Sequence, residues 1–594
     1  MSNRKSASRL YSSGIDWVKK GRFMKYLKDR NTWVWICYIL LVLSTAFVSF
    51  QVYALGVFPD KVLYPFLLIL GLICLIAFLL NLEFKHSKKV VIGVLVVSVL
   101  LSSLYMLGAY YIYLTNGTLA SVTAIKNTND NNVSVVVMND SDIHALQELA
   151  GKKIGVLKNI DKGGTEKALE QIQKEMPVEF EQVELDSVPQ EAMALYSGEV
   201  DAVILNEAYR TNVTELDDYA DFSQKTRVVF QAHFKTSATN EALAVSDVTT
   251  KPYNILISGN DTYGDVGELS RSDVNMVVTV NPMTSTVLLT SIPRDSYVPV
   301  DCGDAYACAE GELDKITHTG INGITSTKRT VEKLLNIDIN YTFRVNFSSV
   351  TNIVDSLGGI DIEVPEGQAV ETFYADSTLE GVTEGWNHLN GERALSFARE
   401  RYAYVDGDNQ RVRNQQMVLK AIFNKATSPE IIVNYASLLN ALESAFDTTL
   451  SQDEITSFIK YQIQAMPVWK FETYQVSGEG STLFCPSLGQ AAYVTVLDEN
   501  TVALAHDKIQ AVLDGKDADE VTEPQTEESE GNLYQQDLSG TDVYSGTEYY
   551  GDYPNYYDAS QWDASAAGDM EEPPYDSTED IYDPDHSAED SSQD

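Results

Sequence analysis

Residues 271–295 read RSDVNMVVTVNPMTSTVLLTSIPRD, and this stretch decides the fold of the largest domain. Two apolar runs, Val274–Val280 and Ser285–Ile292, flank an Asn-Pro turn and predict two neighbouring strands. In an antiparallel hairpin the start of the first strand lies beside the end of the second. We therefore expect Asp273 and Arg294 at the same edge of a sheet, although charges at strand ends are often only solvated termini.

Upstream of the hairpin, YNILISGND (253–261) predicts a further strand that ends on Asp261. Downstream, Arg399 and Arg401 are two apart, and on an extended segment their side chains would point the same way. Three more polar residues share one face of a predicted helix whose other face is apolar: they are Asp408, Arg411 and Gln415, opposite Met417, Val418, Ala421 and Ile422. Arginine forks suit bidentate binding of phosphate oxygens. The alternative is a set of surface salt bridges.

The N-terminal part of the chain predicts a membrane anchor. Three apolar stretches, 33–58, 62–82 and 90–114, have 21 to 26 residues, and a helix needs about 20 to cross a bilayer core. The basic segment 1–32 and the lysine-rich loop between the second and third stretches predict a cytoplasmic N-terminus. Everything after about residue 115 is then expected on the outer face of a membrane.

The rest of the chain divides by composition into two domains and a tail. The net charge of −42 over 594 residues argues against a nucleic-acid partner, because binding phosphate backbones needs a basic surface. Residues 517–594 hold 24 acidic residues and no Lys or Arg, so a disordered acidic, tyrosine-rich tail is expected. Between anchor and tail we expect an accessory domain at 120–250 and a larger α/β domain at 252–516.

The accessory domain alternates strand-like and helix-like runs, which predicts a parallel α/β unit. The runs are Ser134–Met138, Lys153–Leu157, the amphipathic Thr165–Glu175, and Ala202–Leu205. In the larger domain, Cys302 and Cys308 are close enough in sequence to close a small loop, and an oxidising compartment would favour a disulfide there.

Five motifs of the larger domain occur in one order: RSDVNMVVTVNP (271–282), SIPRDSYV (291–298), DKITHTGINGI (314–324), INYTFRVNFSSVTNIVDSLGGIDIEV (339–364) and HLNGERALSFARERYAYVDGDNQRVRNQQMVLKAIF (388–423). Together they resemble the LytR-CpsA-Psr family of bacterial cell-envelope proteins, and the layout resembles its subgroup with three spans and an accessory domain. In the accessory domain, ELAGKKIGVL (148–157) and EAMALYSGEVDAVILNEAY (191–209) resemble one lobe of an extracellular solute-binding domain.

The family resemblance implies an α/β/α fold around a mixed sheet, with a deep apolar pocket for a polyprenyl chain. It also implies an enzyme, a phosphotransferase of the Gram-positive cell wall. Such an enzyme moves a glycopolymer (teichoic acid, capsule or another wall polymer) from a polyprenyl-pyrophosphate carrier to peptidoglycan. The product is a phosphodiester, polyprenyl phosphate is released, and pyrophosphate hydrolysis is a conceivable side activity.

The same resemblance implies roles for individual residues. Asp261 and Asp273 would hold Mg²⁺, which prefers carboxylate and phosphate oxygens. The pyrophosphate ligands would be Arg294, Lys315, Arg399, Arg401, Arg411 and Gln415, and the catalytic set would be Arg294, Arg399, Arg401 and Asp408, with Asp408 fixing an arginine. Many members carry an arginine two positions after the first aspartate, where this chain has Tyr263. We interpret Arg344 as a structural residue.

Two alternatives stay open at the level of sequence. Aliphatic residues could line the lipid pocket or form ordinary core, since both need the same side chains; they are Leu334, Leu335, Ile337, Ile353, Val354, Leu357 and Ile360. The alternative to an enzyme is a non-catalytic receptor for polyprenyl-pyrophosphate lipids or wall material.

Overall fold

The computed structural model describes residues 30–522, apart from 84–87, 124–127, 176, 178, 238–241, 264, 304–307, 309, 429–440 and 442–444. The basic segment before Arg30 and the acidic tail after Thr522 lie outside the described residues. The predicted start of that tail at 517 needs correction. Ala518 is fully buried in the core of the larger domain, and its N–H donates to Glu472 Oε2 at 3.0 Å. The fold therefore continues a few residues beyond 516.

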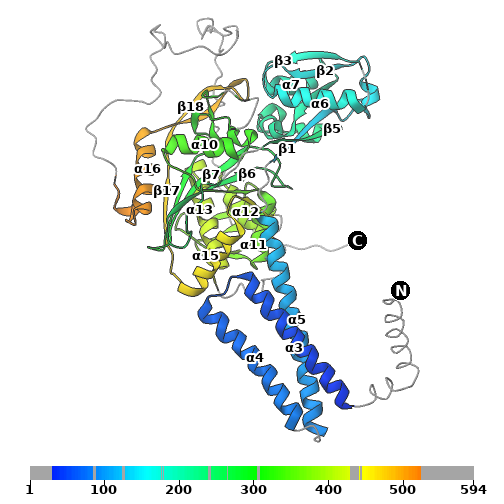
Figure 1. The fold of residues 1–594 in the computed structure, drawn as a ribbon. Helices are drawn as coiled ribbons and strands as arrows, with labels where there is room; N and C mark the ends of the chain where they lie inside the picture. Colours follow the sequence, from blue (N-terminus) through cyan, green and yellow to red (C-terminus); the bar gives the residue numbers. More distant parts are fainter. Residues whose placement is uncertain are drawn as a thin grey trace, which may run out of the picture. The chain divides into compact units, whose positions relative to one another are not determined.

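The predicted anchor consists of three helices, α3 (Arg30–Leu55), α4 (Asp60–Glu83) and α5 (Lys88–Val122) (Figure 1). Each is long and apolar enough to cross a membrane. Leu41 and Ala109 pack between the helices, whereas most of the large apolar side chains point outward. Outward apolar side chains are what a lipid environment requires.

The accessory domain is built on a five-stranded sheet in the order β3-β2-β4-β1-β5. Its strands are β1 (Thr128–Met138), β2 (Lys153–Leu157), β3 (Glu181–Leu185), β4 (Ala202–Asn206) and β5 (Thr226–Ser237), and its main helices are α6 (Lys162–Glu175) and α7 (Val188–Ser197). The sheet is mixed, so the prediction of a parallel unit is only partly right. β2 is parallel to β3 and β4, but β1 pairs antiparallel with both β4 and β5. After β4 the chain returns through short helical turns to the far side of β1, and β5 therefore runs against it.

The larger domain is built on a six-stranded sheet in the order β16-β11-β6-β7-β8-β17. Its strands are β6 (Tyr253–Asn260), β7 (Ser272–Asn281), β8 (Thr286–Ile292), β11 (Tyr341–Val345), β16 (Asp447–Thr448) and β17 (Lys470–Gln475). The central strands β6, β7 and β8 are antiparallel, while β11 joins β6 and β17 joins β8 in parallel. This is the mixed sheet that the family resemblance implies.

The predicted hairpin is confirmed, and its register places the charged residues. Asn275 pairs with Ile292 and Asn281 with Thr286. Continuing that register by two residues brings Asp273 opposite Arg294, so a short turn between two apolar strands is enough to join the two charges.

Helices cover both faces of the sheet (Figure 1). Since side chains alternate along a strand, Leu256 and Val277 face one side, in a core shared with α10 (Ile324–Leu335) and α16 (Glu499–Leu513). Met276 faces the other side, which is covered by α13 (Gly407–Ala426) and α15 (Gln452–Ala465), with α11 (Phe347–Ser356) and α12 (Gly391–Arg399) beside them. The smaller elements are β9 (Tyr297–Pro299), β10 (Leu313–Lys315), η4 (Ile316–Asn322), β12 (Ile360–Val364), β13 (Val370–Thr372), β14 (Glu380–Val382), β15 (Gly385–Leu389), β18 (Gly478–Cys485) and β19 (Gln490–Leu497).

The segment that carries Arg399 corrects one local prediction. Arg399 is not in an extended segment but is the last residue of α12, which begins after the N-cap Asn390. The helix forms because its inner face, which includes Ala394 and Phe397, is buried. The predicted helix α13 is confirmed, with Val418 buried in the same core. The disulfide between Cys302 and Cys308 is also present.

Candidate active site

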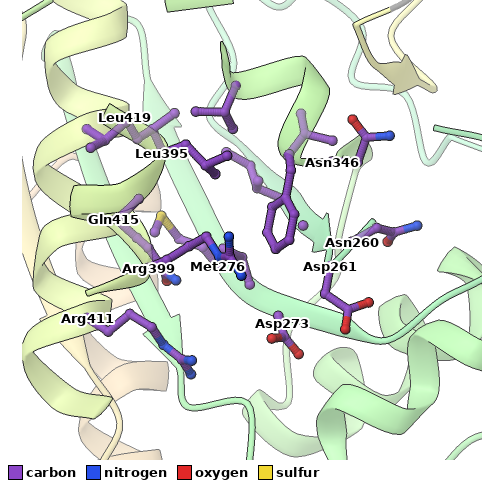
Figure 2. Close-up of a pocket in the computed structure, with 18 of the residues that line it drawn as sticks. Asn260, Asp261, Asp273, Met276, Asn346, Leu395, Arg399, Arg411, Gln415 and Leu419 are labelled. Atoms are coloured by element: carbon purple, nitrogen blue, oxygen red, sulfur yellow. The ribbon is translucent and has the colours of Figure 1, made fainter. Parts of the chain in front are cut away.

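A cavity of about 630 Å³ lies between the sheet and helices α11, α12 and α13. Its deep part is apolar, with walls that include Met276, Phe343, Val350, Ile353, Leu357, Leu395, Val418, Leu419, Ile422, Phe423 and Phe446. Its polar end collects the charged lining residues, which are Glu215, Asp261, Arg271, Asp273, Arg294, Arg399, Glu400, Arg401 and Arg411. Figure 2 shows Leu395 and Leu419 at one end of this space and Asp273 and Arg411 at the other. We call Arg271, Arg294, Arg399, Arg401 and Arg411 the arginine cradle.

The structure separates the aliphatic residues that the sequence left undecided. Ile353 and Leu357 line the cavity. Val354 and Ile360 lie in the core that α11, α12 and α13 share. The other three, Leu334, Leu335 and Ile337, pack on the opposite face of the sheet.

The hairpin pair forms the first part of the polar end. Arg294 Nη1 lies 2.8 Å from Asp273 Oδ2, and Thr317 Oγ1 donates to Asp273 Oδ1 at 2.9 Å. Burial would raise the pKa of Asp273, but Arg294, Arg271 and Arg411 outweigh it and hold that pKa well below its usual range. Asp273 is therefore a permanent anion held in a fixed orientation.

Asp261 comes directly after β6 and pairs with Arg271, which sequence reasoning missed. Arg271 Nε and Nη2 lie 3.0 and 2.6 Å from Asp261 Oδ2. Arg271 stands two residues before Asp273, directly before β7. Residues two apart in an extended segment share a face, so the spacing could have revealed it. Burial raises the pKa of Asp261, the charge of Arg271 opposes the rise, and Asp273 adds to it.

Arg399 and Arg401 meet aromatic rings instead of carboxylates. The guanidinium carbon of Arg399 lies 4.3 Å from the ring centre of Phe347, and that of Arg401 lies 4.4 Å from Tyr402. Within the described part of the chain neither side chain forms a salt bridge. A ring supports a guanidinium through its face. Arg401 Nη2 also donates to the hydroxyl of Tyr402, whereas the fork of Arg399 has no hydrogen-bond partner among the described residues.

Two predicted residues on α13 lie where their spacing placed them. Arg411 is buried, lines the cavity, and forms an ion pair with Asp408. Gln415 also lines the cavity, one turn further along. Asp408 touches the arginine and is not among the lining residues, so the geometry makes it a positioning residue.

Three other residues from the sequence lie outside the lining of the cavity. Lys315 Nζ is 2.9 Å from Asp295 Oδ1, so the structure does not bring it to the arginine cradle as its predicted role requires. Arg344 pairs with Asp447 at 2.8 Å, which fits the structural interpretation. Tyr263 is exposed and packs edge-on against Phe347.

The predicted metal ligands have the chemistry that Mg²⁺ requires. Asp261 and Asp273 line the same end of the cavity, and Figure 2 shows their carboxylates close to each other, at the end away from Leu395 and Leu419. Asp261 Oδ1 is buried and has no hydrogen-bond partner among the described residues. An unpartnered buried carboxylate oxygen beside a second carboxylate suits a hard cation that prefers oxygen ligands.

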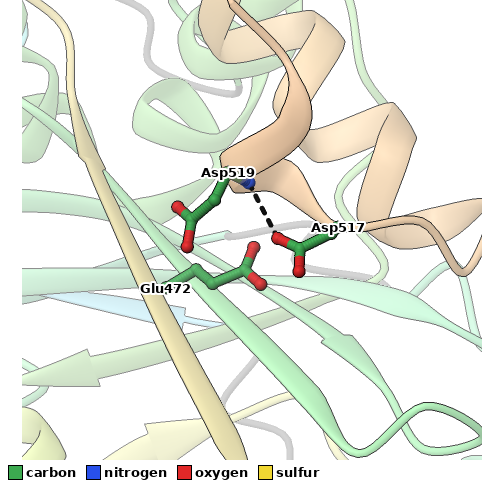
Figure 3. Close-up of side chains that lie close together, drawn as sticks. All are labelled: Glu472, Asp517 and Asp519. Carbon is green, nitrogen blue, oxygen red and sulfur yellow. Dashed lines mark hydrogen bonds between the residues drawn. The ribbon is translucent and has the colours of Figure 1, made fainter.

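A second group of carboxylates lies outside the cavity and pairs with a lysine side chain. Glu472, Asp517 and Asp519 gather where β17 meets the end of the domain (Figure 3). Lys470 Nζ is 2.6 Å from Glu472 Oε1 and also pairs with Asp517. The ammonium group supplies the positive charge there, so this cluster does not resemble a metal site.

Comparison with known proteins assigns the larger domain. A family model described as the LytR_cpsA_psr family matches residues 219–506. The chain is 30% identical over 265 residues to a polyisoprenyl-teichoic acid–peptidoglycan teichoic acid transferase TagU of Bacillus cereus (strain AH820), and the match covers 44% of this chain and 80% of that protein. The chain belongs to the LytR-CpsA-Psr family.

Further similarities are found to one more curated relative, to a second family model and to a solved structure. The TagU protein of Enterococcus faecalis (strain ATCC 700802 / V583) is 34% identical over 227 residues, which cover 37% of this chain and 70% of the relative. A model described as NMT1/THI5 like matches residues 110–250, so the chain also contains an NMT1-like domain. Among solved structures, protein gbs0355 of Streptococcus agalactiae has a TM-score of 0.39 at 25% identity, covering 48% of this chain and 93% of that one.

Proposed function

We propose that this chain transfers a wall glycopolymer from a polyprenyl-pyrophosphate carrier to peptidoglycan on the outer face of the membrane. The observation that carries the proposal is one cavity with an apolar depth and a cationic end. A polyprenyl pyrophosphate has the same division, with a hydrocarbon chain joined to a doubly charged head. Membership of a family whose relatives are named teichoic acid transferases supports this choice of substrate.

In the proposed reaction the sugar hydroxyl of peptidoglycan attacks the phosphorus next to the polymer. A new P–O bond forms, the P–O bond to the lipid phosphate breaks, and the hydroxyl loses its proton to the surroundings. The arginine cradle holds both phosphates and stabilises the charge that develops on the departing lipid phosphate. The apolar walls hold the lipid, which fixes the position of the phosphorus relative to the cradle.

We further propose Mg²⁺ as the cofactor, held by Asp261 and Asp273. When bound, this ion would neutralise phosphate charge and help to orient the phosphate oxygens. Arg271 and Arg294 already pair with these two carboxylates. These ion pairs orient both carboxylates before substrate arrives, and the arginines around Asp273 keep its pKa low.

The proposed orientation puts the N-terminus in the cytoplasm and both folded domains outside, because basic residues are concentrated before α3 and between α4 and α5. The lipid carrier and peptidoglycan would meet on that side.

The test uses the full chain in lipid nanodiscs with a synthetic polyprenyl-pyrophosphate-linked sugar and peptidoglycan fragments. We expect release of polyprenyl phosphate together with sugar phosphate joined to the glycan. EDTA should abolish both products and Mg²⁺ should restore them, while Asp273→Asn should stay inactive at every Mg²⁺ concentration.

Arg399→Ala should lower the rate about a hundredfold or more, since it removes a group that stabilises transition-state charge. Tight lipid binding without turnover, across several donors and acceptors, would contradict the enzyme and support a receptor. Transfer that continues in EDTA would contradict the Mg²⁺ assignment alone.

A further inference from the structure

The accessory domain contributes one carboxylate to the polar end of the cavity. Glu215 directly follows the short helix α8 (Arg210–Thr214), and its N–H donates to Thr211 O at 3.0 Å. Val213, in the same turn, is buried in the accessory core, and Ile321 of the larger domain packs into that core as well. Glu215 thus has a fixed backbone, although it lies far before Arg271, where the first of the five family motifs begins.

Glu215 forms ion pairs with two arginines of the cradle, Arg271 and Arg294. Its carboxylate accepts from Arg271 Nη1 and Nη2 at 2.5 and 2.9 Å, and its Oε1 lies 3.2 Å from Arg294 Nη1. Each arginine also pairs with a carboxylate of its own domain, Arg271 with Asp261 and Arg294 with Asp273. Glu215 therefore takes N–H groups that those partners leave available.

Among the described residues the other three arginines of the cradle form no ion pair with Glu215, and Arg411 pairs with Asp408 of its own helix. Arg399 and Arg401 rest on aromatic rings, with no salt bridge in the part of the chain that the structure describes. The Arg271–Arg294 half of the cradle is thus covered by Glu215, whereas Arg399 and Arg401, which form the other half, pair with no anion in the described residues.

The chemistry of the contact identifies what Glu215 resembles. A carboxylate on a guanidinium fork makes the same parallel N–H···O bonds as two phosphate oxygens. Burial would raise the pKa of Glu215, but Arg271 and Arg294 reverse the effect and lower it to about 2. Glu215 is therefore an anion at physiological pH and a very weak base, which makes it a poor acceptor for the sugar hydroxyl's proton.

Exposure shows which side of the contact can move. The side chain of Glu215 is 42% exposed, whereas the side chain of Arg271 is 6% exposed and that of Arg294 is 9% exposed. A ligand entering the cavity can displace the glutamate into solvent while both arginines stay in place.

We propose that Glu215 sets the affinity of the site for pyrophosphate, as an anion that occupies the Arg271–Arg294 half of the cradle until a second phosphate displaces it. This rests on the proposed function only in taking a pyrophosphate group as the natural ligand. A single phosphate binds the open Arg399–Arg401 half without disturbing Glu215, whereas a pyrophosphate spans both halves and must replace it. When the polymer phosphate has left, Glu215 returns to its arginines and opposes rebinding.

The test measures binding of inorganic pyrophosphate and inorganic phosphate to the full chain in detergent by titration calorimetry, in metal-free buffer. The variants are Glu215→Gln and Glu215→Ala, with Glu170→Gln on the exposed face of α6 as the control. Removing the competing charge should tighten pyrophosphate binding about tenfold, because a charge-assisted hydrogen bond need no longer be displaced. Phosphate binding should tighten less, and the control should match the wild type for both anions.

Unchanged or weaker pyrophosphate binding in both Glu215 variants, with wild-type thermal unfolding, would overturn the inference and make Glu215 a residue that positions the arginines. Neither probe contains lipid or sugar, so the result is independent of the transfer assay. Tighter pyrophosphate binding in a chain that transfers no polymer would keep this inference and remove the proposed function. Normal polymer transfer, together with no gain in pyrophosphate binding by the Glu215 variants, would keep the proposed function and overturn this inference.

Discussion

Arg411 and Arg413 stand two residues apart on α13 and face different surroundings. Arg411 is buried and lines the cavity, while Arg413 is 42% exposed and pairs with Asp406 outside it. We expect Arg411→Ala to lower the transfer rate about a hundredfold, since it removes one cation from the charge that develops on phosphate. Arg413→Ala should leave the rate within about twofold of the wild type, as expected for an exposed ion pair. Initial rates of polyprenyl phosphate release measure both, and equal losses would contradict the assignment.

At the scale of single residues, the sequence predicted contacts between residues of one motif and missed contacts between residues of different domains. Asp273 and Arg294 were predicted together because hairpin register follows from two apolar runs and a turn. Glu215 was not, because its neighbourhood is one of many acidic stretches and only the packing of two domains brings it to Arg271. Lys315 was placed at the cradle by resemblance, but the nearby carboxylate of Asp295 holds it aside.

At the scale of elements, α12 and the sheet form the apolar depth of the cavity. Leu395 lies on α12 and lines that depth. Leu395→Trp should fill the space, so that transfer from a long polyprenyl carrier falls about tenfold or more, while a two-isoprene carrier is used nearly as before. Rates with the two carriers, measured side by side, give the result. Val405→Trp on the exposed turn before α13 is the control and should change neither rate.

If Leu395→Trp lowered both rates equally, the lipid would have to bind elsewhere. Thermal unfolding of the variant separates that outcome from a general loss of structure, since an overpacked core costs about 1–3 kcal/mol.

The loop between β2 and α6 contains a carboxylate that burial keeps partly protonated. Burial raises the pKa of Asp161 to about 7, although Asn206 Nδ2 and the N–H of Gly164 donate to it and oppose the rise. The native state therefore binds this proton more tightly than the unfolded chain does, between about pH 4 and pH 7. Stability is lost as pH rises through that window.

We expect Asp161→Asn to raise the unfolding temperature of the full chain at pH 8 and to leave it unchanged at pH 4, where the carboxyl is neutral in both states. Scanning fluorimetry in detergent at both pH values measures the difference. The exposed Asp140→Asn should have no effect at either pH. A variant less stable than the wild type at pH 8 would show that the charged form is the native one.

For the whole molecule, the proposed orientation can be tested at the two short connections between the helices. Asp60→Cys lies at the start of α4 and Lys88→Cys at the start of α5, in a background where Cys37 and Cys74 are replaced by alanine. A membrane-impermeant maleimide added to intact cells should label Asp60→Cys only. Labelling of Lys88→Cys instead would invert the orientation and place the cavity in the cytoplasm.

The layout of the whole chain was largely predictable, because hydropathy and motif order act over long stretches. The three helices and the disulfide follow from patterns within single segments, and the mixed sheet was expected from the family resemblance of the five ordered motifs. The path of β5 and the burial of Ala518 did not, since they depend on which edge of a sheet remains unpaired once the other strands are in place.

The register of the β7–β8 hairpin has a consequence for how this family member can change over time. Asp273 and Arg294 are opposite each other because a fixed number of residues separates them, and each strand residue advances the chain by about 3.4 Å. Substitutions between them that stay apolar keep the pair together. Inserting or deleting a single residue within either strand would turn every later side chain to the other face. In the lineage of this protein, length variation should therefore be far rarer between these two residues than replacement of one aliphatic side chain by another.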